Sequence, residues 1–561
     1  MTNPSPTKGG RKTRKTRKEG AKDSLGCLDG ASDPNSDRTG RSAGWVRARI
    51  WKLAQGSLHD DQLFIWCLSA GLVTLSWILQ SRIGVNLSDE GFLWYGSWRV
   101  GHGEVPILDF RSYDPGRYYW VAFWSLFFGD GLLGHRAGVS IFQVTGLSLG
   151  LFAVRSVVHK RIHLFLVGVM LVVWMLPRHK LFECALSMGA VYVATRLVQN
   201  PNPRRIWLAG VYVGVAAFFG RNHGLYTFAA FGTILGLLCW QTRTTVLPRA
   251  GRFIGGIVVG YSPMFILVLL HPGFLSSFFS SVLAIVKRGT TNVPLPIPWP
   301  WTVDLAGQYW LQAAHQLLLG VAFMALLGFF PIAVGVIARR PSHVIANRPL
   351  LCAATFVGIA YAHHALVRAD VFHLAQAIHP MLLGVVAMMA TASRRRTKAL
   401  TIVAAAVLAI LTVFVPMYQQ PLAGKLLYDE RYETHVVTGE RIWMWKSDAD
   451  YLDALRGWLD SDVEPGDRVF LDPHGPALYV ILGLRSPVWD IYPLWPGTAE
   501  HQQRMIQELR RNEVRWAVIG QDSREGFKTN NPAVWEFLLE HFEVVHAPGP
   551  SHAFVVFRRL G

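Results

Sequence analysis

Residues 88–119 are dense in side chains suited to acid–base chemistry. This stretch holds five carboxylates (Asp89, Glu90, Glu104, Asp109, Asp114) and three arginines (Arg99, Arg111, Arg117). A carboxylate held partly desolvated beside a membrane is suited to act as a general base. Adjacent Asp89 and Glu90 cannot point the same way on a helix. We therefore expect one to take a proton while the other binds a metal ion or orients an arginine; the competing interpretation is a solvated loop with surface ion pairs.

Cations recur at four other places where apolar segments end. They are Arg178-His179-Lys180, Arg221-Asn222-His223, Lys287-Arg288 and the run from Arg368 to His373, which includes Asp370. A phosphate-bearing ligand would account for such clusters through charge-assisted hydrogen bonds. Taken singly, His223 or His373 is more simply explained as a capping or packing residue.

Apolar segments must position these groups. The chain of 561 residues is 51% hydrophobic and only 16% charged, and its mean hydropathy is +0.26. This composition excludes a soluble enzyme and a disordered protein. Eleven segments predict membrane-spanning helices: 62–82, 135–158, 162–177, 181–199, 206–220, 223–240, 252–270, 311–338, 349–367, 374–391 and 399–417.

Charge predicts the orientation of these spans. Five loops (159–162, 200–206, 241–252, 338–349, 391–399) carry 14 Lys/Arg and no acidic residue. The positive-inside rule places them in the cytosol with the N-terminus, so residues 83–134 and the C-terminal region lie outside. The net charge of +18 therefore needs no nucleic-acid partner. We expect a multi-pass protein of a bacterial-type cytoplasmic membrane.

The domain prediction has three parts. Residues 1–60 form a disordered basic cytosolic tail. Residues 61–417 form the transmembrane domain, whose first outer loop, 83–134, includes an interfacial helix at 118–128. Residues 418–561, in which helical and strand patterns alternate, form a small extracytoplasmic α/β domain. The fold class is thus a polytopic α-helical membrane protein with a C-terminal α/β domain.

The first outer loop also resembles a known family. From Asp89 to Arg136 the order is Asp-Glu-Gly, Gly-x-x-Pro, Asp-Phe, Pro-Gly-x-Tyr-Tyr, a Phe-Gly step, and an arginine that enters the next helix. This order resembles the first periplasmic loop of the GT-C membrane glycosyltransferases, in particular the protein-mannosyltransferase and aminoarabinose-transferase-like group (glycosyltransferase family 39-like). No signature specific to a protein, lipid A or arabinan acceptor is present.

The resemblance implies an inverting hexosyl- or pentosyltransferase that moves a sugar from a polyprenyl phosphate to a hydroxyl of a lipid, glycan or protein of the cell envelope. Asp89 would match the carboxylate that activates the acceptor, and Glu90 the second acidic position. We expect Arg117, Arg221, His223 and Arg368 to bind the donor phosphate, with Asp109, Asp114, Asp370 and His373 in support. Some members of the family use a divalent cation such as Mg²⁺ or Mn²⁺ and others do not, so metal dependence stays open.

Two hypotheses compete with the transferase. A transporter or flippase of a lipid-linked or charged substrate would also need many spans, but it favours polar groups at mid-membrane. A non-catalytic scaffold would leave the pattern of the first outer loop unexplained.

Overall fold

The structure is a computed structural model that describes residues 60–288, 294–305, 307, 309–392, 395–545 and 553–560. The predicted basic tail, residues 1–60, lies outside the described residues except for Asp60. The chain from Gln62 to Gly561 forms one compact unit, and all that follows concerns this unit.

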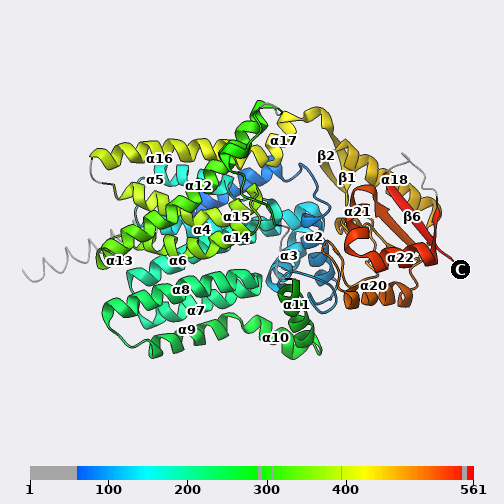
Figure 1. Ribbon diagram of the computed structural model, residues 1–561, viewed down its shortest axis with the longest axis horizontal. Coiled ribbons are helices and arrows are strands. Elements are labelled where there is room, and N and C mark those ends of the chain that lie inside the picture. The colour runs from blue at the N-terminus through cyan, green and yellow to red at the C-terminus, as the bar shows by residue number, and fades with distance from the viewer. Residues whose placement is uncertain are drawn as a thin grey trace, which may run out of the picture. The chain divides into compact units, whose positions relative to one another are not determined.

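Long apolar helices make up most of the fold (Figure 1). Eight helices in the described part of the chain are long and apolar enough to cross a membrane. They are Asp60–Gln80, α4 (Leu132–Arg155), η1 (Arg178–Lys180) with α6 (Leu181–Gln199), α8 (Arg221–Thr242), α12 (Trp310–Arg339), α14 (Pro349–Val367), α15 (Val371–Ala390), and α16 (Arg395–Phe414) with η3 (Met417–Gln419).

The expected count of eleven spans differs from this number. Each of the eleven segments contains helix, but α5 (Arg161–Val173) and α7 (Pro203–Phe219) have only 13 and 17 residues, whereas a span needs about 20. Helix α7 is limited in length because Pro203 starts it and Gly220 follows its last residue. The segment 252–270 is a pair, α9 (Leu247–Gly260) and α10 (Ser262–Leu270), bent by 48°; counted as one span, it raises the number to nine in the described residues.

Three helices lie across one end of the bundle (Figure 1): α2 (Asp89–Gly101), α3 (Pro115–Phe128) and α11 (Phe274–Arg288). The predicted interfacial helix at 118–128 is thus part of α3. Its 14 residues are too few to span a bilayer, and Phe123, Leu126 and Phe127 are exposed. Short elements α13 (Pro341–Asn347), α17 (Pro421–Leu427), η2 (Pro300–Thr302) and η4 (Asp429–Arg431) complete the helical part.

The C-terminal part is a small α/β region, as predicted. The hairpin of β1 (Tyr432–Val437) and β2 (Glu440–Trp445) precedes a sheet of order β3-β4-β6-β5, formed by β3 (Val469–Phe470), β4 (Trp516–Gly520), β6 (Phe554–Arg559) and β5 (Phe542–Val545). Strands β3 and β4 are parallel, and β6 is antiparallel to both of its neighbours. The helices are α18 (Lys446–Asp462), α19 (Ala477–Ile481), α20 (Ala499–Arg511), α21 (Gln521–Asn530) and α22 (Pro532–His541). The boundary drawn at residue 417 stays a prediction.

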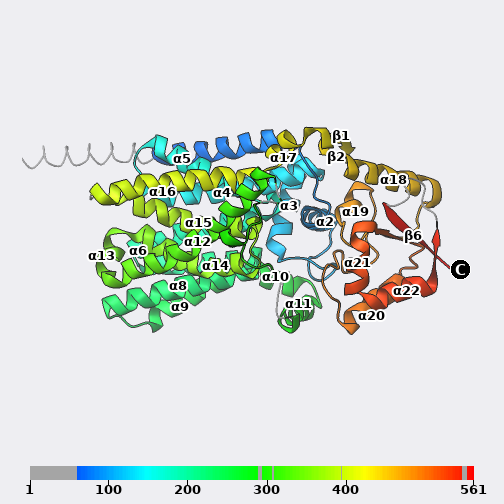
Figure 2. The same cartoon turned by 45° about the horizontal axis from the view of Figure 1, so that its top comes forward.

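This α/β region contacts the loop that joins the first two long helices (Figure 2). The N–H of Gly84 donates to the carbonyl of Trp443 over 2.6 Å, and the N–H of Ala477 donates to the carbonyl of Leu87 over 3.1 Å. A Cβ on Gly91 would lie 2.6 Å from the backbone nitrogen of Ala477, so α2 and α19 approach more closely than a larger residue permits. The N-terminus of α2 is thereby held between the helical bundle and the α/β region.

Candidate active site

Helix α2 begins at the pair of acidic residues that the sequence singles out. The side-chain oxygen of Asn86 accepts the backbone N–H groups of Ser88 and Asp89 over 3.1 and 2.8 Å, and this turn starts the helix. Asp89 and Glu90 therefore occupy the first turn, where the helix dipole favours negative charge. Their side chains leave the helix on different sides and meet different partners.

Glu90 is buried and held by two arginines. Its carboxylate accepts a bidentate pair of hydrogen bonds from Arg136 over 2.8 and 2.7 Å, and Arg178 lies 4.0 Å away. Burial alone would raise the pKa of Glu90, but the two guanidiniums outweigh burial and hold this pKa well below its ordinary value. Of the alternatives open for the second carboxylate, the geometry therefore matches the orientation of an arginine.

Asp89 has no such partner. Its carboxylate is 45% exposed, and the nearest ring nitrogen of His179 is 3.9 Å away. The Tyr492 hydroxyl, from the α/β region, donates to it over 3.5 Å. Burial and the Asp89 charge raise the pKa of Tyr492, which keeps this phenol protonated. Among the described residues, no guanidinium or ammonium group lies within 4.0 Å of Asp89, so this carboxylate is open to an incoming hydroxyl.

Lys180 follows His179 in the chain and contacts Tyr113. The Lys180 ammonium donates to the Tyr113 hydroxyl over 2.9 Å, lies 4.1 Å from the centre of that ring, and interacts electrostatically with Asp89 and Glu183. In the part of the chain that the structure describes, no carboxylate lies within ion-pair distance of Lys180. Its charge is therefore available to a phosphate.

Arg117 is buried, and each of its three side-chain nitrogens donates a hydrogen bond within the protein. Nη1 bonds Glu183 over 3.0 Å, while Nε and Nη2 bond the carbonyl of Phe219 over 3.0 and 2.9 Å at the end of α7. The guanidinium also lies over the Tyr113 ring at 5.0 Å. Arg117 therefore joins α3, α6 and α7 and supports the ring that Lys180 contacts.

Arg221 and His223 start α8 at the same end of the bundle. The backbone N–H and the Nε of Arg221 both contact Asp114 at 2.8 Å, and its Nη1 donates to Ser281 over 3.0 Å. His223 is buried, and its Nδ1 lies 3.1 Å from the Tyr361 hydroxyl. Within the described residues its Nε2 has no hydrogen-bond partner, so this atom can still bind a ligand group.

The third predicted group caps α15. Asp370 accepts the backbone N–H of His373 over 2.8 Å, lies 2.8 Å from the Nδ1 of His373, and pairs with Nε of Arg368 at 2.7 Å. Burial would raise the pKa of Asp370, but these partners lower it below its ordinary value. The residue that caps the helix is thus Asp370, which His373 contacts through its backbone N–H and its ring, and Arg368, about one third exposed, is oriented by Asp370.

Asp109 shapes the first outer loop instead of facing the cluster. Its carboxylate accepts the N–H of Val105 over 2.7 Å. The next residues of this loop bind the α/β region: Arg111 pairs with Asp490 at 2.7 Å, and the Trp489 indole donates to the carbonyls of Ile107 and Leu108 over 3.2 and 3.1 Å. These bonds hold the segment that carries Tyr492.

The structure thus brings together the N-terminus of α2, the start of α6, the start of α8 and the start of α15. Sequence reasoning placed Lys180 in a cation cluster suited to a phosphate but did not name it among the site residues, and it missed Tyr113, Glu183 and Tyr492 as site residues. Of these three residues, Tyr113 could have been found from the sequence, because it lies within the loop pattern between Asp109-Phe110 and Pro115-Gly116. The described residues hold no group of three or more His, Cys, Asp or Glu side chains placed as metal ligands. We derive no step through a metal ion.

No protein-family model and no curated protein matches the chain. Among solved structures, the chain is similar to ArnT from Cupriavidus metallidurans in the apo state, with 15% identity over 92% of this chain and 98% of that one and a TM-score of 0.46. It is also similar to the archaeal oligosaccharyltransferase AglB from Archaeoglobus fulgidus in complex with an inhibitory peptide and a dolichol-phosphate. That match has 11% identity over 89% of this chain and 74% of the other, with a TM-score of 0.44.

Proposed function

We propose that the chain is an inverting membrane glycosyltransferase that transfers a sugar from a polyprenyl phosphate to an acceptor hydroxyl at the outer face of the membrane. The observation that carries the proposal is the contrast between Asp89 and the other carboxylates around it. Glu90, Glu104, Asp114, Glu183, Asp370 and Asp490 each pair with an arginine, and the Asp109 carboxylate accepts the N–H of Val105 within its own loop, whereas Asp89 has neither kind of partner. The resemblance of the first outer loop to GT-C enzymes supports the same role for Asp89.

In the proposed reaction, Asp89 accepts the proton of the acceptor hydroxyl as that oxygen attacks the anomeric carbon. The bond from this carbon to the phosphate oxygen breaks on the opposite face of the sugar, so its configuration inverts. The products are the glycosylated acceptor and the polyprenyl phosphate. A positioned general base typically contributes about 100- to 10,000-fold to the rate.

The departing phosphate gains negative charge and needs a cation. We assign this role first to Lys180, because its ammonium has no carboxylate at ion-pair distance among the described residues and because it follows His179, whose ring lies 3.9 Å from Asp89. Arg221, Arg368 and the free nitrogen of His223 are further donors for the phosphate. Arg117, whose nitrogens are all bonded within the protein, acts by holding Tyr113 and Glu183 in place.

The experiment is a transfer assay in membrane vesicles that contain the wild-type protein or Asp89→Asn. Polyprenyl phosphates that carry different radiolabelled sugars are supplied, and label is scored in lipid, protein and glycan fractions. The proposal predicts that one donor is consumed by the wild type and not by Asp89→Asn, and that the labelled fraction identifies the acceptor class.

The same vesicles test the competing transporter. Movement of an intact labelled lipid across the membrane, at equal rates in wild type and Asp89→Asn and without transfer of its sugar, would contradict the transferase and favour a flippase.

A further inference from the structure

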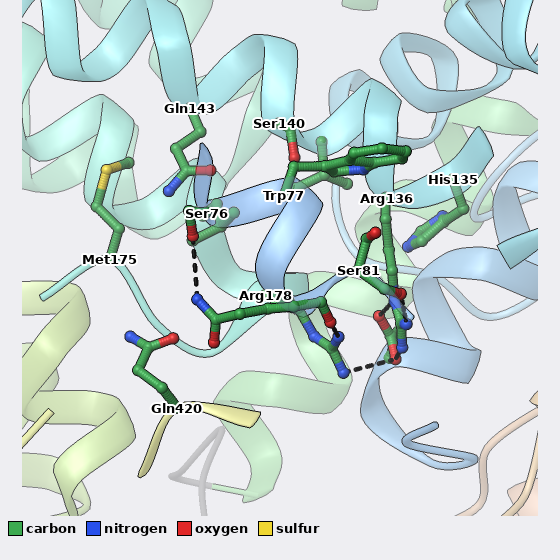
Figure 3. A pocket seen from close by; sticks show the side chains of 14 residues that line it. Ser76, Trp77, Ser81, His135, Arg136, Ser140, Gln143, Met175, Arg178 and Gln420 are labelled. Carbon is green, nitrogen blue, oxygen red and sulfur yellow. Dashed lines mark hydrogen bonds and ion pairs between the residues drawn. The ribbon is translucent and has the colours of Figure 1, made fainter. Parts of the chain in front are cut away.

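A pocket lies on the Glu90 side of α2 (Figure 3). Helix Asp60–Gln80, α4, and the segment that leads into α6 form its walls. Most of its lining is polar and includes Ser76, Gln80, Arg136, Ser140, Gln143 and Arg178. The cavity volume is about 40 Å³. Since one water needs about 10–15 Å³ on the same measure, the pocket has room for more than a single water.

The pocket carries an excess of positive charge. Among the residues that line it, the cations are Arg136 and Arg178, and the carboxylate is Glu90. Arg136 takes both oxygens of Glu90, at 2.8 and 2.7 Å. Arg178 is 4.0 Å from that carboxylate and donates instead to the carbonyls of Gln80 and Gly84, over 2.9 and 3.3 Å. The charge of Arg178 is therefore only weakly compensated within a largely apolar bundle.

Buried polar atoms in the lining also lack partners. In the described part of the chain, no hydrogen bond reaches Nε1 of Trp77, Oε1 of Gln80, or either ring nitrogen of His135, which is 1% exposed. Most buried polar groups in proteins are hydrogen-bonded, so orphaned atoms gathered around one cavity indicate a missing ligand. Among these unpartnered atoms, Nε1 of Trp77 and one ring nitrogen of neutral His135 can donate an N–H, whereas Oε1 of Gln80 accepts.

Helix Asp60–Gln80, which lines the pocket through Ser76, Trp77 and Gln80, has an exposed apolar side. On either side of Ser76 and Trp77, Leu75, Ile78 and Leu79 are 53%, 64% and 47% exposed, as expected of side chains that face lipid. A molecule with a charged head in the pocket can therefore lay its hydrocarbon chains along this helix.

We propose that this pocket is a binding site for a phosphate-class oxyanion, held by Arg178 with Trp77 and Gln143 as further donors, and that the anion is the headgroup of a membrane lipid. The site lies beyond the proposed transfer reaction and does not depend on it. A bound phosphate gives Arg178 a close anionic partner. It also stabilises the part of the structure in which Glu90 and Arg136 pair, at the start of α2.

Native mass spectrometry of the full-length protein in detergent tests this proposal. The protein is titrated with dioleoyl phosphatidylglycerol and with dioleoylglycerol, which has the same chains and no phosphate. Hydrogen bonds to charged groups are worth about ten-fold or more in affinity, so we expect phosphatidylglycerol to bind wild type at least about ten-fold more tightly than Arg178→Gln. Dioleoylglycerol should bind both proteins equally.

Inorganic phosphate forms the second arm and distinguishes the two sources of the anion. If phosphate alone raises the Tm of wild type but not of Arg178→Gln, and phosphatidylglycerol adds nothing, the site takes free phosphate. Equal binding of phosphatidylglycerol to wild type and Arg178→Gln, with no Arg178-dependent effect of phosphate, would overturn the site.

Three further variants control for folding. Arg178→Lys keeps the charge and should retain most of the binding. Arg205→Gln removes a cation near the start of α7, where it donates to the carbonyl of Arg196, and should bind as wild type does. If Arg178→Gln does not fold, Gln143→Leu, which roughly keeps the size of the side chain, takes its place. Phosphatidylglycerol binding that is weakened several-fold in Gln143→Leu supports the site, and unchanged binding overturns it.

Discussion

Asp89 and Glu90 are adjacent in the first turn of α2, but their side chains lie in different surroundings. On one side Glu90 is buried and bonded twice to Arg136, in a pocket with Arg178. On the other side Asp89 is 45% exposed, with Tyr492 at 3.5 Å and His179 at 3.9 Å, and Lys180 follows His179 in the chain.

This difference separates structure from chemistry. A buried carboxylate that two guanidiniums hold in its ionised form lacks both access to a substrate and the basicity to take its proton. A half-exposed carboxylate in a helix first turn keeps both. We therefore assign support of the loop to the Glu90 side and proton transfer to the Asp89 side, and the predictions below test this division.

The largest effect on folding should come from Glu90→Gln. Breaking a buried ion pair by removing one partner typically costs about 3–5 kcal/mol, because the remaining charge is left buried and unpaired. We expect a strongly lowered Tm or a loss of folded protein in detergent. Asp89→Asn is the matched control and should stay within about 0.5 kcal/mol of wild type; equal Tm values for the two variants would remove the distinction between the sides.

Lys180→Met should mainly reduce turnover. Loss of one donor to a developing negative charge typically costs about 100-fold in rate, and Lys180→Arg should recover part of it. The measurement is the initial rate of sugar transfer at saturating donor, per folded protein. A rate within two-fold of wild type for Lys180→Met would place the phosphate elsewhere, with Arg221 or Arg368 as the next residues to change.

Acid should weaken the contact that brings Tyr492 to Asp89. Burial would raise the pKa of Asp490, but Arg111 and His501 lower it from 3.8 to about 2. A carboxyl group whose pKa is lower in the folded than in the unfolded state stabilises the fold at pH values above the unfolded-state pKa. This contribution, about 2 kcal/mol, is lost as the pH falls from about 4 to about 2. Tm measured between pH 6 and 3 should fall, and in Asp490→Asn the Tm should start lower and fall less; parallel curves would contradict this role.

The smallest effect is expected from Tyr492→Phe. The hydroxyl donates one long hydrogen bond to Asp89, at 3.5 Å, so its loss should slow transfer by about two- to ten-fold. Tyr451→Phe, which removes a hydroxyl 3.3 Å from Asp472 in the same region, is the control and should leave the rate unchanged. The ratio of the two rates measures how far the α/β region contributes to the Asp89 side.

Local patterns in the sequence predict much of this fold. The apolar runs locate the long helices, and the alternation of helical and strand patterns after residue 417 corresponds to the α/β region. The hairpin of β1 and β2 was missed, because Thr438-Gly439 is not one of the common hairpin turn pairs, although both residues adopt positive φ.

The site was predicted in composition but not in pairing. The clusters at 178–180, 221–223 and 368–373 do gather at one end of the bundle. Which cation pairs with which acid depends on tertiary packing: Arg117 meets Glu183, 66 residues away, and Arg221 meets Asp114, 107 residues away. For this reason the sequence grouped Arg117 with the phosphate ligands and did not single out Lys180 within its cluster.

The most direct test of the central claim is the single-turnover rate of sugar transfer by folded Asp89→Asn, compared with wild type at the same protein concentration in lipid nanodiscs. We predict a rate about 100- to 10,000-fold lower with an unchanged Tm. Transfer by Asp89→Asn at the wild-type rate would contradict the assignment of Asp89 as the base.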